Sequence, residues 1–226
     1  MTPAARLAAA IEVIDAIARE RRPAADALKA WGLAHRFAGS GDRTAIAGLV
    51  YDTLRRRASA AWLMESDSPR AVVLGMLKRE RGLDPAAIER LADGSRHAPE
   101  PLSDAERARL VTATLDGAPA HIAGDYPEWL DPAFAASFGE ARADEGAGLA
   151  SRAPLDLRAN TLKASREAAL AMLDDLAFAA TRWSPWGLRL ALAADARNPA
   201  IHAEPAFIKG AVEVQEDAEI AQTDDE

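Results

Sequence analysis

Apolar residues recur at helical spacing through the first two thirds of the chain. Between Pro3 and Arg22 the apolar positions Leu7, Ile11, Ile14 and Ala18 lie three or four residues apart, as on the inward face of an amphipathic helix. The same criteria predict further helices, separated by glycine or proline, over 24–31, 42–57, 69–79, 85–93, 104–115 and 132–138. Gly32 is expected to end the second helix and Asp42 to cap the third.

The periodicity changes near residue 150, where a domain boundary is expected after an Ala/Gly-rich, weakly patterned stretch over 140–149. Leu155 and Leu157 alternate with Asp156 and Arg158, the pattern of a half-buried strand. Ser165 stands where a helix N-cap is expected. The elements then predicted are a helix over 165–176, strands over 181–183, 188–190 and 211–215, and a short segment between 198 and 207.

This order, β-α-β-β-α-β, is that of a ferredoxin-like unit. The predicted fold class is therefore α+β. An all-helical domain is expected over 1–149, a small α+β subdomain over 150–215, and a disordered acidic tail over 216–226.

Composition narrows the possible chemistry. The 226 residues contain no cysteine, which excludes a disulfide scaffold, a thiolate metal site and a cysteine nucleophile within them. The four histidines lie far apart and show no metal-ligand spacing. Neither a secretion signal nor an apolar run of about 18 residues is found. A cytoplasmic protein without a membrane or metal partner is expected.

The net charge of −8 is unevenly distributed. Residues 1–65 carry ten Lys/Arg and seven Asp/Glu, and residues 150–215 carry eight and seven. The acids concentrate in residues 66–149, with fifteen against nine bases, and in residues 216–226, with six and no base. This distribution permits local RNA binding but not general binding of polyanions.

The strongest candidate site follows the first predicted strand. Arg158, Asn160 and Lys163 lie together at its end, and no acid occurs between Asp156 and Glu167. Arginine and lysine bind RNA phosphates, and asparagine reads exposed base edges. The alternative is structural: Arg158 would pair with Asp156 or Asp174, and Asn160 would form a turn.

Weaker candidates lie elsewhere. The run Arg55-Arg56-Arg57 is either part of an RNA-facing patch or a solvated helix end favoured by the helix dipole. Arg43 either contacts RNA or joins two helices through an acid. Trp183 and Trp186 flank a predicted turn and either stack on bases or belong to the core. The Gly39-Ser-Gly41 stretch lacks a preceding strand and a third glycine, so it is not a nucleotide fingerprint.

The segment Pro154-Leu-Asp-Leu-Arg-Ala-Asn-Thr-Leu-Lys163 resembles the one before the catalytic domain of RsmB-type RNA (cytosine-C5) methyltransferases. The helical opening, with Gly41-Asp-Arg43 leading to the arginine run, resembles their NusB-like RNA-binding domain. Tyr126-Pro-Glu-Trp-Leu130 resembles the end of that helical part, and Phe207–Gln215 resembles the linker into the catalytic domain. The resemblance implies a NusB-like domain followed by a ferredoxin-like or RRM-like subdomain, with ribosomal RNA as the partner.

The same resemblance implies S-adenosylmethionine as the cofactor of the full-length family, together with two catalytic cysteines and a glycine-rich cofactor loop. This chain has no cysteine and no strand–Gly-x-Gly–helix pattern, so it is expected to bind no cofactor and to be inactive alone. The interpretation is an RNA-recognition portion, either truncated or working beside a separate catalytic domain. The alternatives are a stand-alone RNA-binding or ribosome-assembly module, and a helical protein-interaction adaptor.

Overall fold

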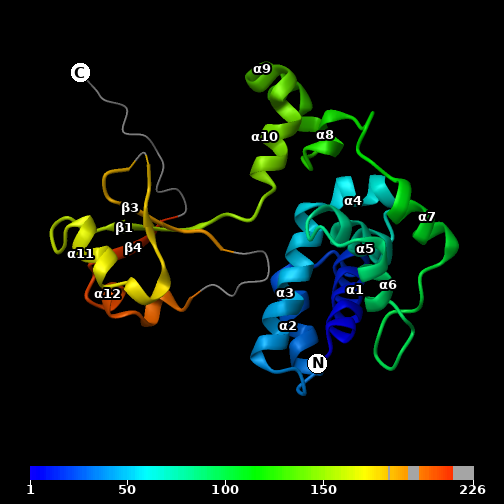
Figure 1. Ribbon diagram of the computed structural model, residues 1–226, viewed down its shortest axis with the longest axis horizontal. Helices are drawn as coiled ribbons and strands as arrows, with labels where there is room; N and C mark the ends of the chain where they lie inside the picture. Colours follow the sequence, from blue (N-terminus) through cyan, green and yellow to red (C-terminus); the bar gives the residue numbers. More distant parts are fainter. Residues whose placement is uncertain (183, 193–198, 216–226) are drawn as a thin grey trace. The chain divides into compact units, whose positions relative to one another are not determined.

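The computed structural model describes residues 1–182, 184–192 and 199–215, drawn in colour in Figure 1. Two compact units share the chain, the first from Met1 to Ser151 and the second beginning at Arg152. Trp183 and the acidic tail 216–226 lie outside the described residues, so the stacking role of Trp183 and the disorder of the tail stay predictions.

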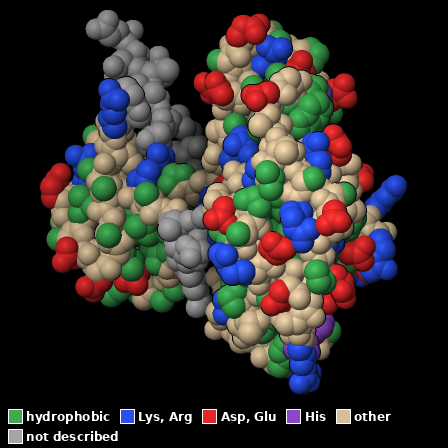
Figure 2. Space-filling view, turned by 45° about the vertical axis from the view of Figure 1, so that its right-hand side comes forward, with side chains coloured by type: hydrophobic (Ala, Val, Ile, Leu, Met, Phe, Trp, Pro, Cys, Tyr) green, Lys and Arg blue, Asp and Glu red, His purple; other side chains and the backbone are tan. Residues whose placement is uncertain are grey.

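The first unit is helical. Its elements are α1 (Pro3–Glu20), α2 (Ala24–Ala34), α3 (Ser40–Arg55), α4 (Arg57–Met64), α5 (Pro69–Arg79), α6 (Pro85–Leu91), α7 (Asp104–Thr112), α8 (Ala120–Ala123), η1 (Glu128–Leu130), α9 (Asp131–Phe138), η2 (Gly139–Ala141) and α10 (Arg142–Leu149). On the face drawn in Figure 2, basic and acidic side chains are interspersed over the described part of this unit.

Helix α5 is the centre of the helical unit, and α1, α3, α4, α6 and α7 contact it (Figure 1). Every residue from Ala71 to Leu77 is buried, whereas an amphipathic surface helix buries one stripe only. The closest neighbour is α4: a Cβ on Gly75 would lie 2.5 Å from the Ala60 carbonyl oxygen. Glycine at this position therefore allows the two helices to pack backbone against backbone.

Helix ends agree with the sequence prediction where the capping residue bonds an amide in the first turn of its own helix. The predicted bounds of α5 are confirmed. The helix begins at Pro69 because the Ser68 hydroxyl accepts a hydrogen bond from the Ala71 amide, and proline suits the first turn. Helix α7 begins with a capping box formed by Ser103 and Glu106.

Two cap predictions were wrong. Helix α2 continues past Gly32 to Ala34, and Gly32 is a buried position within it. Helix α3 begins at Ser40, so Asp42 lies in its first turn and does not cap it. The Asp42 carboxylate instead accepts hydrogen bonds from the Met1 amino group at 3.1 Å and from Arg6 Nε at 2.9 Å, which joins α3 to the start of α1.

The Ala/Gly-rich residues 140–149, whose sequence shows little helical pattern, form the end of η2 and α10. Tyr126 packs against this region, because a Cβ on Gly146 of α10 would overlap its ring. The same ring stacks on Phe134 of α9 at 4.3 Å, and its hydroxyl donates to Asp131 at 2.7 Å. Burial, followed by the bond to the Asp131 carboxylate, raises the pKa of Tyr126 to about 12. The alanine-rich segment is helical because this aromatic cluster supplies packing that its own pattern lacks.

The second unit is α+β. Its elements are β1 (Leu155–Ala159), α11 (Arg166–Ala171), η3 (Asp174–Leu176), β2 (Ala179–Ala180), β3 (Gly187–Leu190), η4 (Ile201–Ala203), α12 (Pro205–Ile208) and β4 (Val212–Gln215). The strands form one antiparallel sheet in the order β2-β3-β1-β4. The β-α-β-β-α-β order and the α+β fold class are confirmed.

One sheet face carries the core of this unit. Leu157 and Ala159 of β1, Leu188 of β3 and Val212 of β4 are buried with residues of α11 and α12. Ser165 caps α11 as predicted, because its hydroxyl accepts from the Ala168 amide. The second strand was misplaced: it lies at 179–180, and Thr181 is a buried residue whose hydroxyl donates to the Ser184 carbonyl.

Candidate nucleic-acid interface

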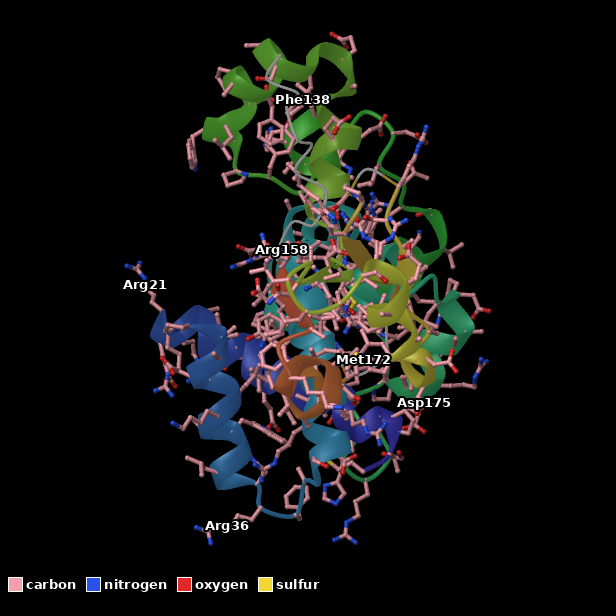
Figure 3. All side chains as sticks on the ribbon, turned by 90° about the vertical axis from the view of Figure 1, so that its left-hand side faces the viewer. Arg21, Arg36, Phe138, Arg158, Met172 and Asp175 are labelled. Atoms are coloured by element: carbon pink, nitrogen blue, oxygen red, sulfur yellow. The ribbon has the colours of Figure 1, made fainter. Side chains whose placement is uncertain are left out.

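The sheet face opposite the core presents Arg158, and its partner is neither acid expected from the sequence. Arg158 lies opposite Glu213 in the register of β1 and β4, and its Nη2 pairs with Glu213 Oε2 at 2.7 Å. Asp156 is instead held by Arg189 of β3 through two bonds of 2.7 Å. The side chain of Arg158 remains 53% exposed, and Figure 3 shows it extending away from the ribbon.

Asn160 and Lys163 follow β1 and lie beside the turn between α12 and β4. Asn160 Nδ2 donates to the Gly210 carbonyl at 3.1 Å, and its Oδ1 accepts from the Leu162 amide at 3.2 Å. Lys163 Nζ donates to the Lys209 carbonyl at 2.9 Å. Both polar atoms of the Asn160 side-chain amide are thus hydrogen-bonded to the backbone, whereas the exposed Lys163 ammonium retains two N–H donors without a partner among the described residues.

Gly210 makes this arrangement possible. Its φ of +68° lies in the left-handed region, which other residues adopt at a cost. A Cβ there would lie 2.8 Å from Lys163 Nζ. Glycine therefore allows the lysine to lie over the turn and reach the Lys209 carbonyl.

We call the exposed surface formed by Leu162, Lys163, Ile208 and Lys209 the basic corner. Within the described residues neither lysine forms an ion pair, and Leu162 and Ile208 are 94% and 70% exposed. These side chains combine two free positive charges with apolar surface.

Two acids close in sequence to the lysines of the basic corner have partners of their own. Glu213 pairs with Arg158. The pKa of Glu167 is lowered by its own backbone amide and by the Ser165 hydroxyl at the start of α11. The positive charge of the two lysines is therefore not neutralised locally by these carboxylates.

Trp186 directly precedes β3. Its carbonyl accepts a hydrogen bond from the Ala159 amide at 2.9 Å, which places it at the end of β1. The side chain is 38% exposed, so part of the indole surface is accessible to a ligand at this end of the sheet.

The arginine run at 55–57 is not the continuous surface patch expected from the sequence. The helix breaks at Arg56, between α3 and α4, and the three side chains have different environments. Arg55 pairs with the buried Asp52, whereas Arg57 is exposed and makes no ion pair within the described residues. Arg57 alone has the expected surface position.

Arg56 is buried, with 8% of its side chain exposed. Its Nε bonds Glu80 at 2.6 Å, Nη1 bonds the Ala147 carbonyl at 3.0 Å, and Nη2 bonds the Ser151 hydroxyl at 3.2 Å. These partners come from the end of α5 and the end of α10. Arg56 therefore joins distant parts of the helical unit, and the expected RNA-facing role does not fit its position.

Asp125 completes this buried network. Its carboxylate accepts from the Ser59 amide at 2.8 Å and hydroxyl at 2.7 Å, and Arg56 Nη1 lies 3.8 Å away. Desolvation raises the pKa of Asp125, while the Ser59 bonds and the charge of Arg56 oppose that shift.

Arg43 has a structural contact, though not through an acid. Its Nε donates to the Ala38 carbonyl at 2.9 Å, and its guanidinium lies against Gly32 of α2. It joins α3 to the preceding turn and leaves its outer edge exposed.

A nucleotide cofactor does not fit the Gly39-Ser-Gly41 stretch. It follows α2 instead of a strand, and a Cβ on Gly39 or Gly41 would meet nothing closer than 3.9 Å. Asp42 occupies the first turn that would have to receive a phosphate. These residues therefore supply no cradle for S-adenosylmethionine.

In the described part of the chain, no helix is long and apolar enough to cross a membrane. The same residues contain no group of three or more His, Asp or Glu side chains arranged to hold a metal ion.

Sequence reasoning placed Asn160 and Lys163 together but missed Lys209 and Gly210. A signal was available: in a β-α-β-β-α-β unit the last strand pairs with the first, so the turn before β4 lies beside the loop after β1. The Lys209-Gly210 pair stands in that turn.

Part of the chain matches a known protein family. Residues 126–197 match the sequence model described as the Methyltr_RsmF/B-like, ferredoxin-like domain. The match begins at Tyr126, covers α9 and α10, and continues over β1, α11, β2 and β3. It supports a relation of this part of the chain to the N-terminal region of RsmB- and RsmF-type methyltransferases. No curated protein matches the chain.

Proposed function

We propose that this chain is the RNA-recognition portion of an RNA (cytosine-C5) methyltransferase of the RsmB/RsmF type, and that ribosomal RNA contacts its basic corner. The α+β fold and the match over 126–197 support the family relation. The helical unit would correspond to the NusB-like domain of that family.

The observation that carries the proposal is the fixed position of Lys163. Its ammonium is held on the Lys209 carbonyl without any carboxylate partner in the described residues, and Gly210 leaves the space that it needs. Ordering a lysine side chain costs rotamer entropy, and a single bond to a carbonyl on the surface returns little. An RNA phosphate would supply the missing counter-charge.

A phosphodiester at the basic corner would contact both ammonium groups, and the exposed Leu162 and Ile208 would meet the flat face of a base or the ribose. Arg158 would join after exchanging Glu213 for a phosphate, a small cost because exposed ion pairs contribute about 0–1 kcal/mol. Asn160 would act indirectly, by holding the two loops together through Gly210.

Methyl transfer is assigned to residues outside this chain. The family chemistry needs a cysteine to attack cytosine, and the 226 residues contain none. We therefore expect that calorimetric titration detects no binding of S-adenosylmethionine to this chain.

Salt-dependent RNA binding tests the proposal. The full chain is titrated into a labelled single-stranded RNA of about 12 nucleotides, and anisotropy is followed at several salt concentrations. Each phosphate contact contributes about 0.7 to the slope of log affinity against log salt for a single strand. Lys163→Ala/Lys209→Ala should therefore weaken binding of every RNA and reduce the slope by about 1.4.

Arg90→Ala/Arg96→Ala is the matched control, because it removes two exposed charges of the helical unit that form no ion pair with any described residue. It should change neither affinity nor slope. Circular dichroism checks that both variants fold. An unchanged slope in the lysine variant, or an equal loss in the control, contradicts the assignment of RNA to the basic corner.

A further inference from the structure

A groove of about 360 Å³ lies between α2 and α3 of the helical unit. Leu28, Trp31 and Leu33 line it from α2, and Ile46 and Ala47 line it from α3. It belongs to the first unit, whereas the basic corner belongs to the second. The lining is therefore mainly apolar and comes from two adjacent helices.

The rim of this groove exposes large apolar side chains. Leu33 is 62% exposed and Phe37 is 72% exposed. His35 stacks on Trp31 at 4.2 Å and meets the Phe37 ring edge-on at 5.7 Å. Ring contacts from Trp31 through His35 thus hold Phe37 in place. Phe37 extends the apolar surface beyond the groove.

Positive charge surrounds this apolar surface. Lys29 and Arg43 line the groove, and Arg36 projects outward from the turn between α2 and α3 (Figure 3). In the described part of the chain none of the three forms an ion pair with an acid. Glu12 lies nearby, but its carboxylate already accepts a hydrogen bond from the Trp31 indole at 2.9 Å.

We propose that this groove binds an acidic amphipathic helix of a protein partner. The partner would insert two or three large apolar side chains spaced at i, i+3/i+4 and i+7 between α2 and α3, as in other helix-in-groove complexes. Its acidic flanks would face Lys29, Arg36 and Arg43. This protein-binding role goes beyond the proposed RNA recognition and does not depend on it.

The composition of the groove favours a peptide over a nucleobase. A base brings several donors and acceptors on its edge, and burying them without partners costs free energy. Lys29 and Arg43 can only donate hydrogen bonds, so the Thr44 hydroxyl is the one acceptor that the lining side chains offer to the N–H groups of a base. The Trp31 N–H is already engaged with Glu12. Aliphatic side chains have no polar atoms, so burying them in the groove leaves no hydrogen-bonding group without a partner.

A designed peptide tests the groove. The probe is a labelled helical peptide with leucine at i, i+4 and i+7 and glutamate at most other positions. One control peptide has lysine in place of glutamate, and another disperses the leucines over all faces. The full chain should bind the probe with an affinity that falls with salt, and should bind both controls at least tenfold more weakly.

Variants locate the contact. Leu33→Ser/Phe37→Ser should weaken binding of the probe at least tenfold, and Lys29→Glu/Arg36→Glu should do the same while improving the lysine peptide. Val111→Ser is the control, since Val111 is 63% exposed on α7, away from the groove. All substituted positions are exposed, so the fold should persist, and circular dichroism checks this.

Three outcomes would overturn the proposal. The first is equal affinity for the probe and the dispersed-leucine peptide. The second is displacement of the probe by single-stranded RNA in the parent but not in the groove variants, which would make the groove an RNA site. The third is self-association of the chain that Leu33→Ser/Phe37→Ser abolishes, which would make a second copy the occupant.

Discussion

Replacing Arg56 with alanine should destabilise the helical unit far more than replacing its neighbour Arg57. The Arg56 guanidinium bonds Glu80, the Ala147 carbonyl and the Ser151 hydroxyl, and lies 3.8 Å from Asp125. Its side chain is 8% exposed, and that of Asp125 is 1% exposed. Loss of Arg56 would remove the cation that faces the shielded carboxylates of Glu80 and Asp125.

The expected cost follows from this burial. Removing one partner of a buried ion pair typically costs about 3–5 kcal/mol, because the remaining charge stays desolvated. With a urea dependence of roughly 2 kcal/mol per molar, the unfolding midpoint should fall by roughly 1.5–2.5 M. Arg57→Ala removes an exposed charge and should change stability by less than about 0.5 kcal/mol.

Urea unfolding followed by circular dichroism at the helical signal measures both variants in the full chain. Arg56→Lys should fall between them, because it retains a charge but loses the divergent donors that reach Ala147 and Ser151. If Arg56→Ala and Arg57→Ala have the same midpoint, Arg56 is not the buried cation that joins α5 to α10. The reasoning would then be refuted.

Three further changes test other parts of the structure. Gly210→Ala should destabilise the second unit by about 1–2 kcal/mol, because φ is +68° and the new Cβ meets Lys163; thermal unfolding measures this effect. The same substitution should weaken RNA binding, which anisotropy measures. The hydrogen bonds from the Met1 amino group, then from Arg6, lower the pKa of Asp42 below its usual value of 3.8. The parent should therefore have a larger free energy of unfolding than Asp42→Asn at neutral pH, and this difference should disappear only as pH falls through the lowered pKa. A stability difference that persists unchanged in acid would contradict the ion pair. Ser103→Ala should cost about 1 kcal/mol in urea unfolding, because it removes half of a capping box, and no loss would show that the start of α7 is held by packing alone.

Features determined by neighbouring residues were predictable from the sequence. The bounds of α5 follow from Ser68, Pro69 and the basic end of the helix, and the cap of α11 follows from Ser165. The strand β1 follows from the alternation of Leu155 to Arg158. In each case the stabilising contacts lie within one or two turns of the chain.

Features determined by distant residues were not predictable in this way. The break at Arg56 depends on Glu80 and Ala147, which approach it only in the folded unit. The partner of Arg158 depends on the register of β4, which places Glu213 opposite it. The position of Lys163 likewise depends on a turn 46 residues away.

Photochemical cross-linking tests the central claim most directly. A single-stranded RNA carrying 4-thiouridine is irradiated with the full chain, and the attached peptides are identified by mass spectrometry. We predict cross-links concentrated at Leu162–Lys163 and Ile208–Lys209, and reduced at both in Lys163→Ala/Lys209→Ala. Cross-links confined to the helical unit, with none at the basic corner, would contradict the account.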